Sequence, residues 1–262
     1  PEVPVHVENF SSPKELREED ASAVEALGAG GVYVGNADDA ESEAMIEKMR
    51  TRGVRVLTYG FHAHADVRGG KPSVRYALVD GAESPVGMEF AVTHEGEKYT
   101  VYLNGVLGVH VCSAVLAGIA VGLLEGERLG ELVRTMATFH SPRGRMCIIP
   151  GKAGSTIIDD SYNSSPIALA GALETLRTVK GKRKIAMLGD MLELGSFSVS
   201  EHWSAGRRAG EFVDELITVG KRGTLLAEGA KSAGLPEGRI HVFLNSIEAG
   251  EFMRGIQQKG DI

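Results

Sequence analysis

Two acidic turns follow strand-like apolar runs in the second half of the chain. In the first, Ile157-Ile158 leads directly into Asp159 and Asp160, and Ser165-Pro166 then begins a helix-like segment. Adjacent carboxylates at a strand end can accept hydrogen bonds from ribose hydroxyls or hold a metal-bound water. They can equally end the strand and cap the turn. The residue types therefore leave a nucleotide-binding and a structural interpretation open.

The second acidic turn lies in segment 189–195, where Asp190 and Glu193 stand between two glycines. We expect both carboxylates to project into a crevice, although a glycine-bounded loop with solvated acids explains the same residues. Arg145, within Gly144-Arg145-Met146, carries the guanidinium fork that suits phosphate oxygens. A surface ion pair is the commoner role of a single arginine.

Several histidines could bind a metal ion or a nucleotide. His6 and Glu8 share one face of a strand end or turn, which is a weak metal-binding pattern. His62 and His64 have the same spacing but no further ligands in the sequence, so we expect a solvated loop there. His110 precedes a long apolar run, where its ring either meets a nucleotide or satisfies a helix end.

Composition and charge narrow the class of protein. The chain has 262 residues, a formal net charge of −7 and 43% hydrophobic residues, which favours a globular protein with one large or two ordinary domains. The acidic balance disfavours a nucleic-acid-binding face. No apolar run approaches the roughly 18 residues of a membrane span. Two cysteines and no secretory signal pattern indicate a reducing, cytoplasmic setting.

Both ends of the sequence look cut. It begins at Pro1 without an initiator Met, and residues 260–262 have the pattern of a strand start. We therefore expect an internal piece of a longer protein. The sequence contains no G-x-x-x-x-G-K-[ST] phosphate loop, so any ATP chemistry would take its triphosphate cradle from sequence outside this chain.

The first half of the chain alternates helix and strand patterns. A helix start at residues 12–15 has an N-cap, a proline and a capping-box glutamate. The run 111–124 is apolar nearly all round, which predicts a fully buried helix, and apolar spacing predicts an amphipathic helix over 129–139. We also expect helices over 13–27 and up to residue 50, strands at 32–34 and 54–58, and a hairpin of 89–93 with 99–103.

The second half repeats a strand–helix pattern, which predicts a parallel, doubly wound sheet. The helix-breaking residues 140–144 place a domain boundary near residue 143, giving domains 1–143 and 144–262. Ligands of such sheets lie beyond the carboxyl ends of the strands, which selects both acidic turns and residues 220–221. Expected strands are 155–158, 184–188, 215–219 and 239–243, and expected helices are 166–179, 200–212, 222–233 and 246–258.

Together these motifs resemble those of the Mur ligases, and within that family the MurF branch, over essentially the whole chain. Related folylpolyglutamate and cyanophycin synthetases share the fold but usually carry a histidine where this chain has Tyr162. The matching patterns are DD-[ST]-YN-x-x-P at 159–166, GDM-x-ELG at 189–195 followed by His202, GRM at 144–146, N-x-DD at 36–39 and G-x-H at 108–110.

The resemblance implies an α/β fold: part of a central ATPase domain over 1–143, then a Rossmann-like, doubly wound C-terminal domain over 144–262, truncated at its end. It implies a cytoplasmic, monomeric amide ligase of peptidoglycan precursor synthesis. Such an enzyme uses ATP and Mg²⁺ to join D-Ala-D-Ala to UDP-MurNAc-tripeptide through an acyl phosphate. The implied roles are His6 for the metal, Asn36, His110, Arg145, Asp160 and Asn163 for ATP, and Asp190 and Glu193 for the substrate cleft.

Two positions depart from the family pattern. Asp20 stands where the family usually has a carbamylated lysine, so its carboxylate either replaces the carbamate or marks a divergent site. We expect it to face the same cavity as His6. Val111 stands where an asparagine usually follows the residue equivalent to His110, which weakens the expectation of adenine contacts.

We expect the acidic, glycine-bounded turns of the two domains to face each other across a hinge near residue 143. The leading hypothesis is an incomplete amide ligase. The alternative is a non-catalytic nucleotide- or partner-binding module that kept the fold after losing the phosphate loop and the lysine.

Overall fold

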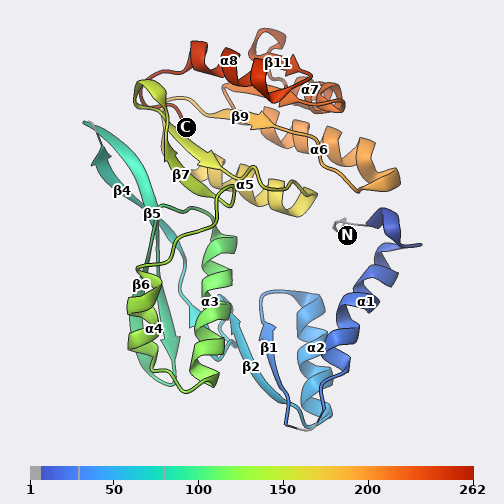
Figure 1. Cartoon of the computed structure of the whole chain (residues 1–262), viewed down its shortest axis with the longest axis vertical. Helices are drawn as coiled ribbons and strands as arrows, with labels where there is room; N and C mark the ends of the chain where they lie inside the picture. Colours follow the sequence, from blue (N-terminus) through green and yellow to red (C-terminus); the bar gives the residue numbers. More distant parts are fainter. Residues whose placement is uncertain (1–6, 29, 80) are drawn as a thin grey trace. The chain divides into compact units, whose positions relative to one another are not determined.

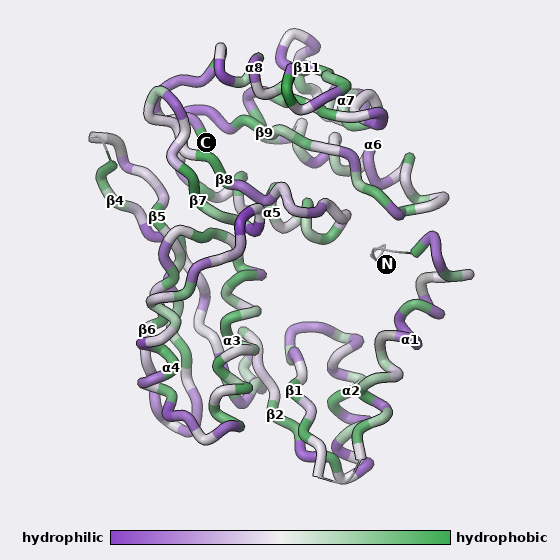
Figure 2. The backbone as a smooth tube through the Cα atoms, in the orientation of Figure 1, coloured by the Kyte–Doolittle hydropathy of each residue, from purple (hydrophilic) through white to green (hydrophobic). Residues whose placement is uncertain are grey.

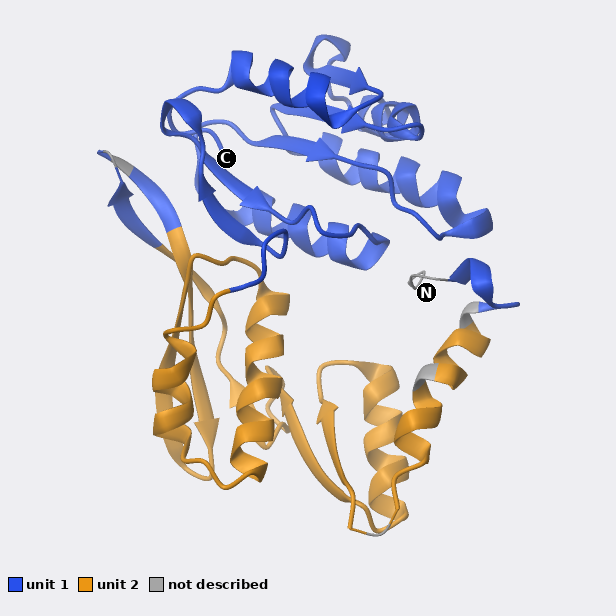
Figure 3. Ribbon diagram, in the orientation of Figure 1, with its two compact units in different colours: residues 1–13, 76–85, 141–262 blue, residues 14–75, 86–140 orange. Residues whose placement is uncertain are grey.

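The chain forms two compact units in a computed structural model that describes residues 7–28, 30–79 and 81–262 (Figure 3). Unit 1 consists of residues 1–13, 76–85 and 141–262, and unit 2 of residues 14–75 and 86–140. Within the described ranges, none of the helices has the length and apolar character needed to cross a membrane.

A six-stranded mixed sheet has the order β1-β2-β3-β5-β4, with β6 paired to β5 (Figure 1). It belongs to unit 2 except for residues 76–85, which are part of unit 1. β1, β2 and β3 run parallel, whereas β5 is antiparallel to β3 and β6. α3 contacts β1 to β3, and α4 contacts β6. The bounds are α1 (Pro13–Glu25), β1 (Val32–Asn36), α2 (Ala40–Thr51), β2 (Arg55–Gly60), β3 (Val67–Gly69), β4 (Ser73–Val79), β5 (Ala82–His94), β6 (Glu97–Asn104), α3 (Val109–Leu124) and α4 (Leu129–Met136).

α3 is less buried than the sequence predicts. Its sequence is apolar nearly all round, and Figure 2 shows this apolar character along the helix. Within the predicted run 111–124, Leu116 and Ile119 are fully buried, but Val121 is 49% exposed. The expectation of burial on every side is therefore wrong. Within unit 2 the sheet and α4 cover only part of the helix surface, and small residues let this helix pack closely on the covered part.

The second half of the chain forms a three-stranded parallel sheet with the order β11-β10-β9 and a separate pair, β7 and β8. The predicted parallel strand–helix pattern is confirmed for β9 to β11. The bounds are β7 (Cys147–Pro150), β8 (Thr156–Asp159), α5 (Pro166–Thr178), β9 (Ile185–Leu188), α6 (Ser198–Gly210), β10 (Glu215–Val219), α7 (Gly223–Ser232), β11 (Ile240–Phe243) and α8 (Ser246–Ile256).

Alternate residues of β10 face different helices. Ile217 packs in a cluster with Ala249 of α8, whereas the next residue, Thr218, lies beside Gly223 at the start of α7. Because successive side chains of a strand point to opposite faces, helices cover both sides of this sheet. This is the doubly wound arrangement that the sequence predicts.

β7, like β3 and β4, is a strand that the sequence did not predict. Its four residues end at Pro150 and run antiparallel to β8, so this edge of unit 1 is not part of the repeating parallel pattern. A four-residue apolar run offers too little periodicity to be recognised as a strand. The helix start that follows β8 is as predicted, because the Ser165 side chain accepts a hydrogen bond from Ala168 N and Pro166 occupies the first turn.

Glycines allow α6 and α7 to cross at very close range. A Cβ atom added to Gly206 on α6 would lie 1.9 Å from the carbonyl oxygen of Leu226 on α7. A Cβ added to Gly229 on α7 would lie 2.0 Å from the carbonyl oxygen of Trp203 on α6. Both contacts are with backbone, which cannot move aside as a flexible side chain would, so this crossing requires glycine at both positions.

A charged network lies at the amino ends of β9 to β11. Arg183 donates two hydrogen bonds to the Asp261 carboxylate, at 3.0 and 2.6 Å. The nearly buried Glu215 carboxylate accepts hydrogen bonds from Arg239 and from His241 Nε2. Burial raises the pKa of Glu215, but the hydrogen bonds from His241 and Arg239 outweigh it, and the pKa is lowered below its usual 4.5.

The first prediction concerns the α6–α7 crossing. Gly206→Ala should lower the free energy of unfolding by about 1–3 kcal/mol, because the new methyl group overlaps backbone. The matched control is Gly255→Ala on α8, where a Cβ meets no atom within 4 Å, and which should raise stability by up to about 1 kcal/mol. Urea unfolding at pH 7 measures both. Equal effects of the two substitutions would contradict the close crossing.

The second prediction concerns Glu215. Since its pKa is lower in the folded state, its ionised form stabilises the protein above pH 4.5, and this contribution is lost as the pH falls through the folded-state pKa. Glu215→Gln should therefore destabilise the protein at pH 7, and the difference from the original chain should shrink between pH 5 and pH 3. Urea unfolding across this pH range tests it; a difference that stays constant would refute the assignment.

Candidate functional site

The GRM segment and the first acidic turn form one hydrogen-bonded loop pair in unit 1. Asp159 Oδ2 accepts a hydrogen bond from Gly144 N at 3.2 Å, and Asp160 Oδ1 accepts one from Met146 N at 3.2 Å. The Gly144 carbonyl oxygen accepts a hydrogen bond from Tyr162 N at 3.1 Å. Both adjacent carboxylates therefore hold backbone groups of a segment that is 14 or 15 residues away in sequence.

This loop pair presents Arg145. The backbone takes left-handed conformations on both sides of it, with φ of 74° at Gly144 and 55° at Met146. Met146 points inward and is 1% exposed, whereas the Arg145 guanidinium lies over the Tyr162 ring, 4.2 Å from its centroid. Cation–π contact of this kind contributes about 0.5–1 kcal/mol at an exposed site. It favours this position of the guanidinium while leaving both groups accessible.

Tyr162 is the site residue that the sequence analysis quoted without giving it a role. It is 71% exposed and forms the platform under Arg145. No local pattern connects positions 145 and 162. The signal that could have found it is an aromatic residue two positions after a pair of acids at a strand end, where an exposed ring has little to bury against.

A cavity of about 670 Å³ lies next to this loop pair, in the gap between β8 and β9. Residues 260–262 fill the amino end of the same gap: Thr156 N donates to Asp261 O at 2.9 Å, and Ile185 N donates to Ile262 O at 2.8 Å. The cavity is therefore a gap within the sheet region. Its apolar walls come from β8, β9, α5 and α8, and include Ile157, Met187, Leu173, Leu176 and Met253.

Polar residues gather in the loops at the carboxyl ends of β8 and β9, which also line this cavity. Asp160, Asn163 and Asp190 lie there, so three residues predicted for the site come together within unit 1. Asn163 Oδ1 accepts a hydrogen bond from Ser164 N at 2.9 Å, which leaves the side-chain NH₂ group as a donor. These loops, rather than the apolar walls, offer the groups that a nucleotide or peptide would contact.

Asp190 also holds a neighbouring turn. Its carboxylate accepts hydrogen bonds from Lys221 N at 3.1 Å and from Arg222 N at 3.0 Å. A Cβ at Gly220, where φ is 114°, would lie 2.6 Å from the carboxylate, so glycine is needed for this approach. The predicted substrate contact of Asp190 stays a prediction, and it would have to coexist with these two hydrogen bonds.

The remaining site predictions, for Glu193, His6 and Asp20, stay untested. Glu193 is exposed and has a left-handed backbone, with φ of 60°. His6 and the side chain of Asp20 lie outside the described residues, so their expected shared cavity stays a prediction. Among the described residues, no group of three or more His, Cys, Asp or Glu side chains could hold a metal ion.

The side chains of the N-x-DD motif in unit 2 accept hydrogen bonds from backbone N–H groups, as the acids of unit 1 do. Asn36 Oδ1 accepts a hydrogen bond from Asp38 N, and the Asp38 carboxylate accepts hydrogen bonds from Phe61 N and His62 N at 2.8–2.9 Å. Asp39 caps α2. The motif thus joins the loop after β1 to the loop after β2.

His110 lies exposed in the first turn of α3, with its ring against Gly108. A Cβ at Gly108, where φ is 102°, would lie 2.7 Å from the imidazole. Glycine at this position therefore lets the ring fold back over the helix start. Whether this ring meets a nucleotide stays a prediction, as does the nucleotide contact of Asn36.

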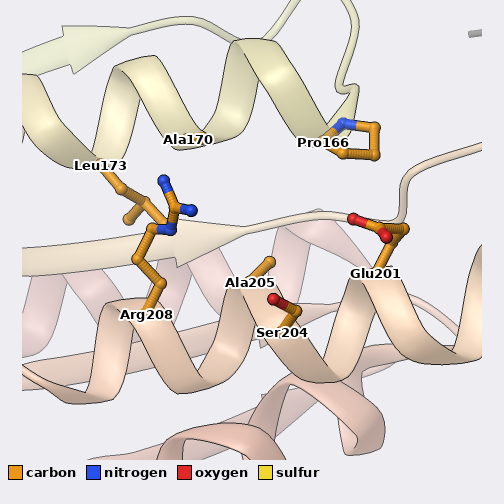
Figure 4. A pocket seen from close by; sticks show the side chains of 7 residues that line it. All are labelled: Pro166, Ala170, Leu173, Glu201, Ser204, Ala205 and Arg208. Carbon is orange, nitrogen blue, oxygen red and sulfur yellow. The ribbon is translucent and has the colours of Figure 1, made fainter. Parts of the chain in front are cut away.

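A second, much smaller cavity of about 40 Å³ lies between α5 and α6 (Figure 4). Figure 4 shows Arg208 and Glu201 on α6 and Pro166 and Leu173 on α5 around it. Its volume suits a few water molecules and no nucleotide. The loops beside the larger cavity therefore remain the candidate site.

Both halves of the chain match domains of known proteins. Residues 3–122 match the Mur ligase middle domain, and residues 144–262 match the Mur ligase glutamate ligase domain. A UDP-N-acetylmuramoyl-tripeptide–D-alanyl-D-alanine ligase of Bacillus subtilis is 27% identical over 229 residues, which is 86% of this chain and 46% of the relative. The Mycobacterium tuberculosis protein of the same name is 31% identical over 223 residues, 82% of this chain and 41% of the relative.

A UDP-N-acetylmuramate–L-alanine ligase of Saccharopolyspora erythraea is also similar, with 26% identity over 276 residues, covering 99% of this chain and 52% of the relative. The chain thus spans about half the length of the curated relatives it matches.

Solved structures show the same fold. MurF from Acinetobacter baumannii superposes with a TM-score of 0.77 at 22% identity, covering 97% of this chain and 52% of that one. MurF from Thermotoga maritima in complex with ADP gives 0.76 at 20% identity, covering 98% and 54%. The predicted α/β fold class and the predicted resemblance are confirmed. The chain belongs to the Mur ligase family.

Proposed function

We propose that this chain is part of an ATP-dependent amide ligase that adds D-Ala-D-Ala to UDP-MurNAc-tripeptide in the cytoplasm, during peptidoglycan precursor synthesis. The names of the Bacillus and Mycobacterium relatives and the matching motifs support this substrate class. Because a relative that is named for adding L-alanine is similar as well, the choice of amine substrate needs a direct test. We propose that the intact enzyme acts as a monomer.

The chemistry proposed is the stepwise activation of a carboxylate. A carboxylate oxygen of the tripeptide attacks the γ-phosphorus of ATP, ADP leaves, and an acyl phosphate forms. The amine of D-Ala-D-Ala then attacks the acyl carbon, and inorganic phosphate leaves as the amide bond forms. Such reactions depend on positioning and on neutralising phosphate charge.

The position of Arg145 supports the proposal that this chain binds ATP. Its guanidinium is fixed over Tyr162 beside a cavity mouth that also holds Asp160 and Asn163. A planar guanidinium donates paired hydrogen bonds to phosphate oxygens. We therefore assign Arg145 to phosphate binding, and Asp160 and Asn163 to hydroxyl and base edges of the nucleotide.

We assign the other predicted residues to the same reaction. Asn36 and His110 would bind the nucleotide from unit 2, and Asp190 and Glu193 would contact the amine substrate. The described carboxylates Asp159, Asp160 and Asp190 already accept backbone hydrogen bonds, and the described residues form no metal cluster. His6 is the residue that was predicted as a metal ligand, so we assign it to Mg²⁺, and no step is assigned to the ion.

The third prediction concerns the chain by itself. The purified chain should neither hydrolyse ATP nor form the amide, because its sequence has no phosphate loop. A phosphate-release assay and mass spectrometry of the UDP-linked product measure these activities. ATP turnover by the chain itself would contradict this prediction.

A chimera tests the ligase function. The segments of the Bacillus subtilis relative that precede and follow its matched region would be joined to the two ends of this chain. The chimera should form the product from UDP-MurNAc-tripeptide and D-Ala-D-Ala, and should not join L-alanine to UDP-MurNAc. A folded chimera that binds ADP without ligating either amine would overturn the proposal and favour the non-catalytic binding module.

The fourth prediction concerns Arg145. In the chimera, Arg145→Ala should lower kcat/KM for ATP by about tenfold to a hundredfold, as expected for the loss of charged hydrogen bonds worth about 1.5–3 kcal/mol. Arg208→Ala, which removes an exposed arginine on α6, is the matched control and should leave kcat/KM within about twofold. Comparable losses in both variants would argue against a phosphate contact by Arg145.

A further inference from the structure

His202 is a fully buried histidine of α6 to which the proposed function gives no role. Its Nε2 atom accepts a hydrogen bond from Met191 N at 2.9 Å, and its Nδ1 atom lies 2.6 Å from the Ser198 carbonyl oxygen. An amide N–H can only donate and a carbonyl oxygen can only accept. The ring therefore fits this site only as the neutral form with its proton on Nδ1.

The loop that His202 holds has a defined conformation. Met191 and Leu194 are almost fully buried and pack in a cluster with Val7. The backbone is left-handed at Glu193 and Gly195, with φ of 60° and 50°. Its hydrogen bond with Met191 N is a polar contact between α6 and segment 189–195, so the His202 imidazole connects the two.

The connection continues through Asp190. This residue precedes Met191, and its carboxylate accepts hydrogen bonds from Lys221 N and Arg222 N. His202 therefore stabilises the loop after β9 through Met191, and the loop after β10 through the neighbouring Asp190. Both loops lie at the carboxyl ends of parallel strands, where ligands of such sheets bind.

The charged groups near the ring act in opposite directions. Burial is the largest effect and lowers the pKa of His202 below its usual 6.5, whereas the Ser198 carbonyl, Asp190 of the loop and Glu201 of α6 raise it. Arg222, which precedes α7, lowers it further. The ring is neutral at pH 7. Because the unfolded chain binds the proton more readily, stability is lost as the pH falls below about 6.5.

We propose that neutral His202 is a positioning residue: it fixes segment 189–195 through Met191 N, and protonation of the ring releases this loop and with it Asp190. The imidazolium would place an Nε2–H group against the Met191 N–H, so the two donors would repel each other. The loop's use in substrate binding rests on the proposed function, whereas the hydrogen-bonded arrangement itself does not.

Two NMR measurements on the purified chain test the arrangement without any substrate. Imidazole nitrogen shifts at pH 7 should identify the Nδ1–H form. The hydrogen-exchange protection factor of the Met191 amide, compared with that of the buried Ile217 amide, should fall at least fivefold between pH 7 and pH 5. A ring that is charged or carries its proton on Nε2 at pH 7 would overturn the proposal.

A matched pair of variants separates the hydrogen bond from general packing. His202→Gln keeps an acceptor oxygen near the position of Nε2 and does not titrate, so Met191 protection should stay high and independent of pH. His202→Asn is too short to supply that acceptor, so protection should be low at both pH values. Equal protection in the two variants would refute the role of the Nε2 acceptor.

Ligation by the chimera tests the link to function. His202→Asn should lower kcat/KM for D-Ala-D-Ala at least tenfold, and His202→Gln should restore it to within about threefold. Equal rates in the two variants would refute the positioning role. Failure of the unsubstituted chimera to ligate would count against the proposed function, while the NMR measurements would decide the arrangement of His202 separately.

Discussion

The candidate site depends on hydrogen bonds from backbone N–H groups to carboxylates at the ends of strands. Asp159 and Asp160 hold the GRM segment, and Asp190 holds the turn after β10. A carboxylate is a charged acceptor, so a hydrogen bond to it is stronger than one between neutral groups. These acids fix the loops that carry the exposed groups. Arg145, on one of these loops, is the strongest described candidate for contact with phosphate.

The same construction recurs in unit 2, where Asp38 accepts hydrogen bonds from Phe61 N and His62 N. Glycine completes the pattern in both units, because Asp38 and Asp190 approach Gly60 and Gly220 more closely than a Cβ would allow. An acidic residue at one strand end and a glycine at the next therefore form a pair. Substituting either one would disturb a loop, even where neither residue touches a ligand.

Local sequence patterns predicted most elements of unit 1, because each has a local cause, such as the Ser165 cap and Pro166 at the start of α5. They could not predict β7, whose four residues lack periodicity, or the exposed side of α3. Sequence order placed the acids at strand ends but could not show what they bind. The partners of Asp159 and Asp190 lie 15 and 31–32 residues away, and only the folded chain brings them together.

Amide hydrogen exchange in the Asp190→Ala variant tests most directly whether these carboxylates hold the loops. Removing the carboxylate should sharply lower the protection of the Lys221 and Arg222 amides, while the Ile217 amide in the centre of β10 should keep most of its protection. Unchanged protection at Lys221 and Arg222 in a folded variant would show that the turn is held by other interactions, and would contradict the account.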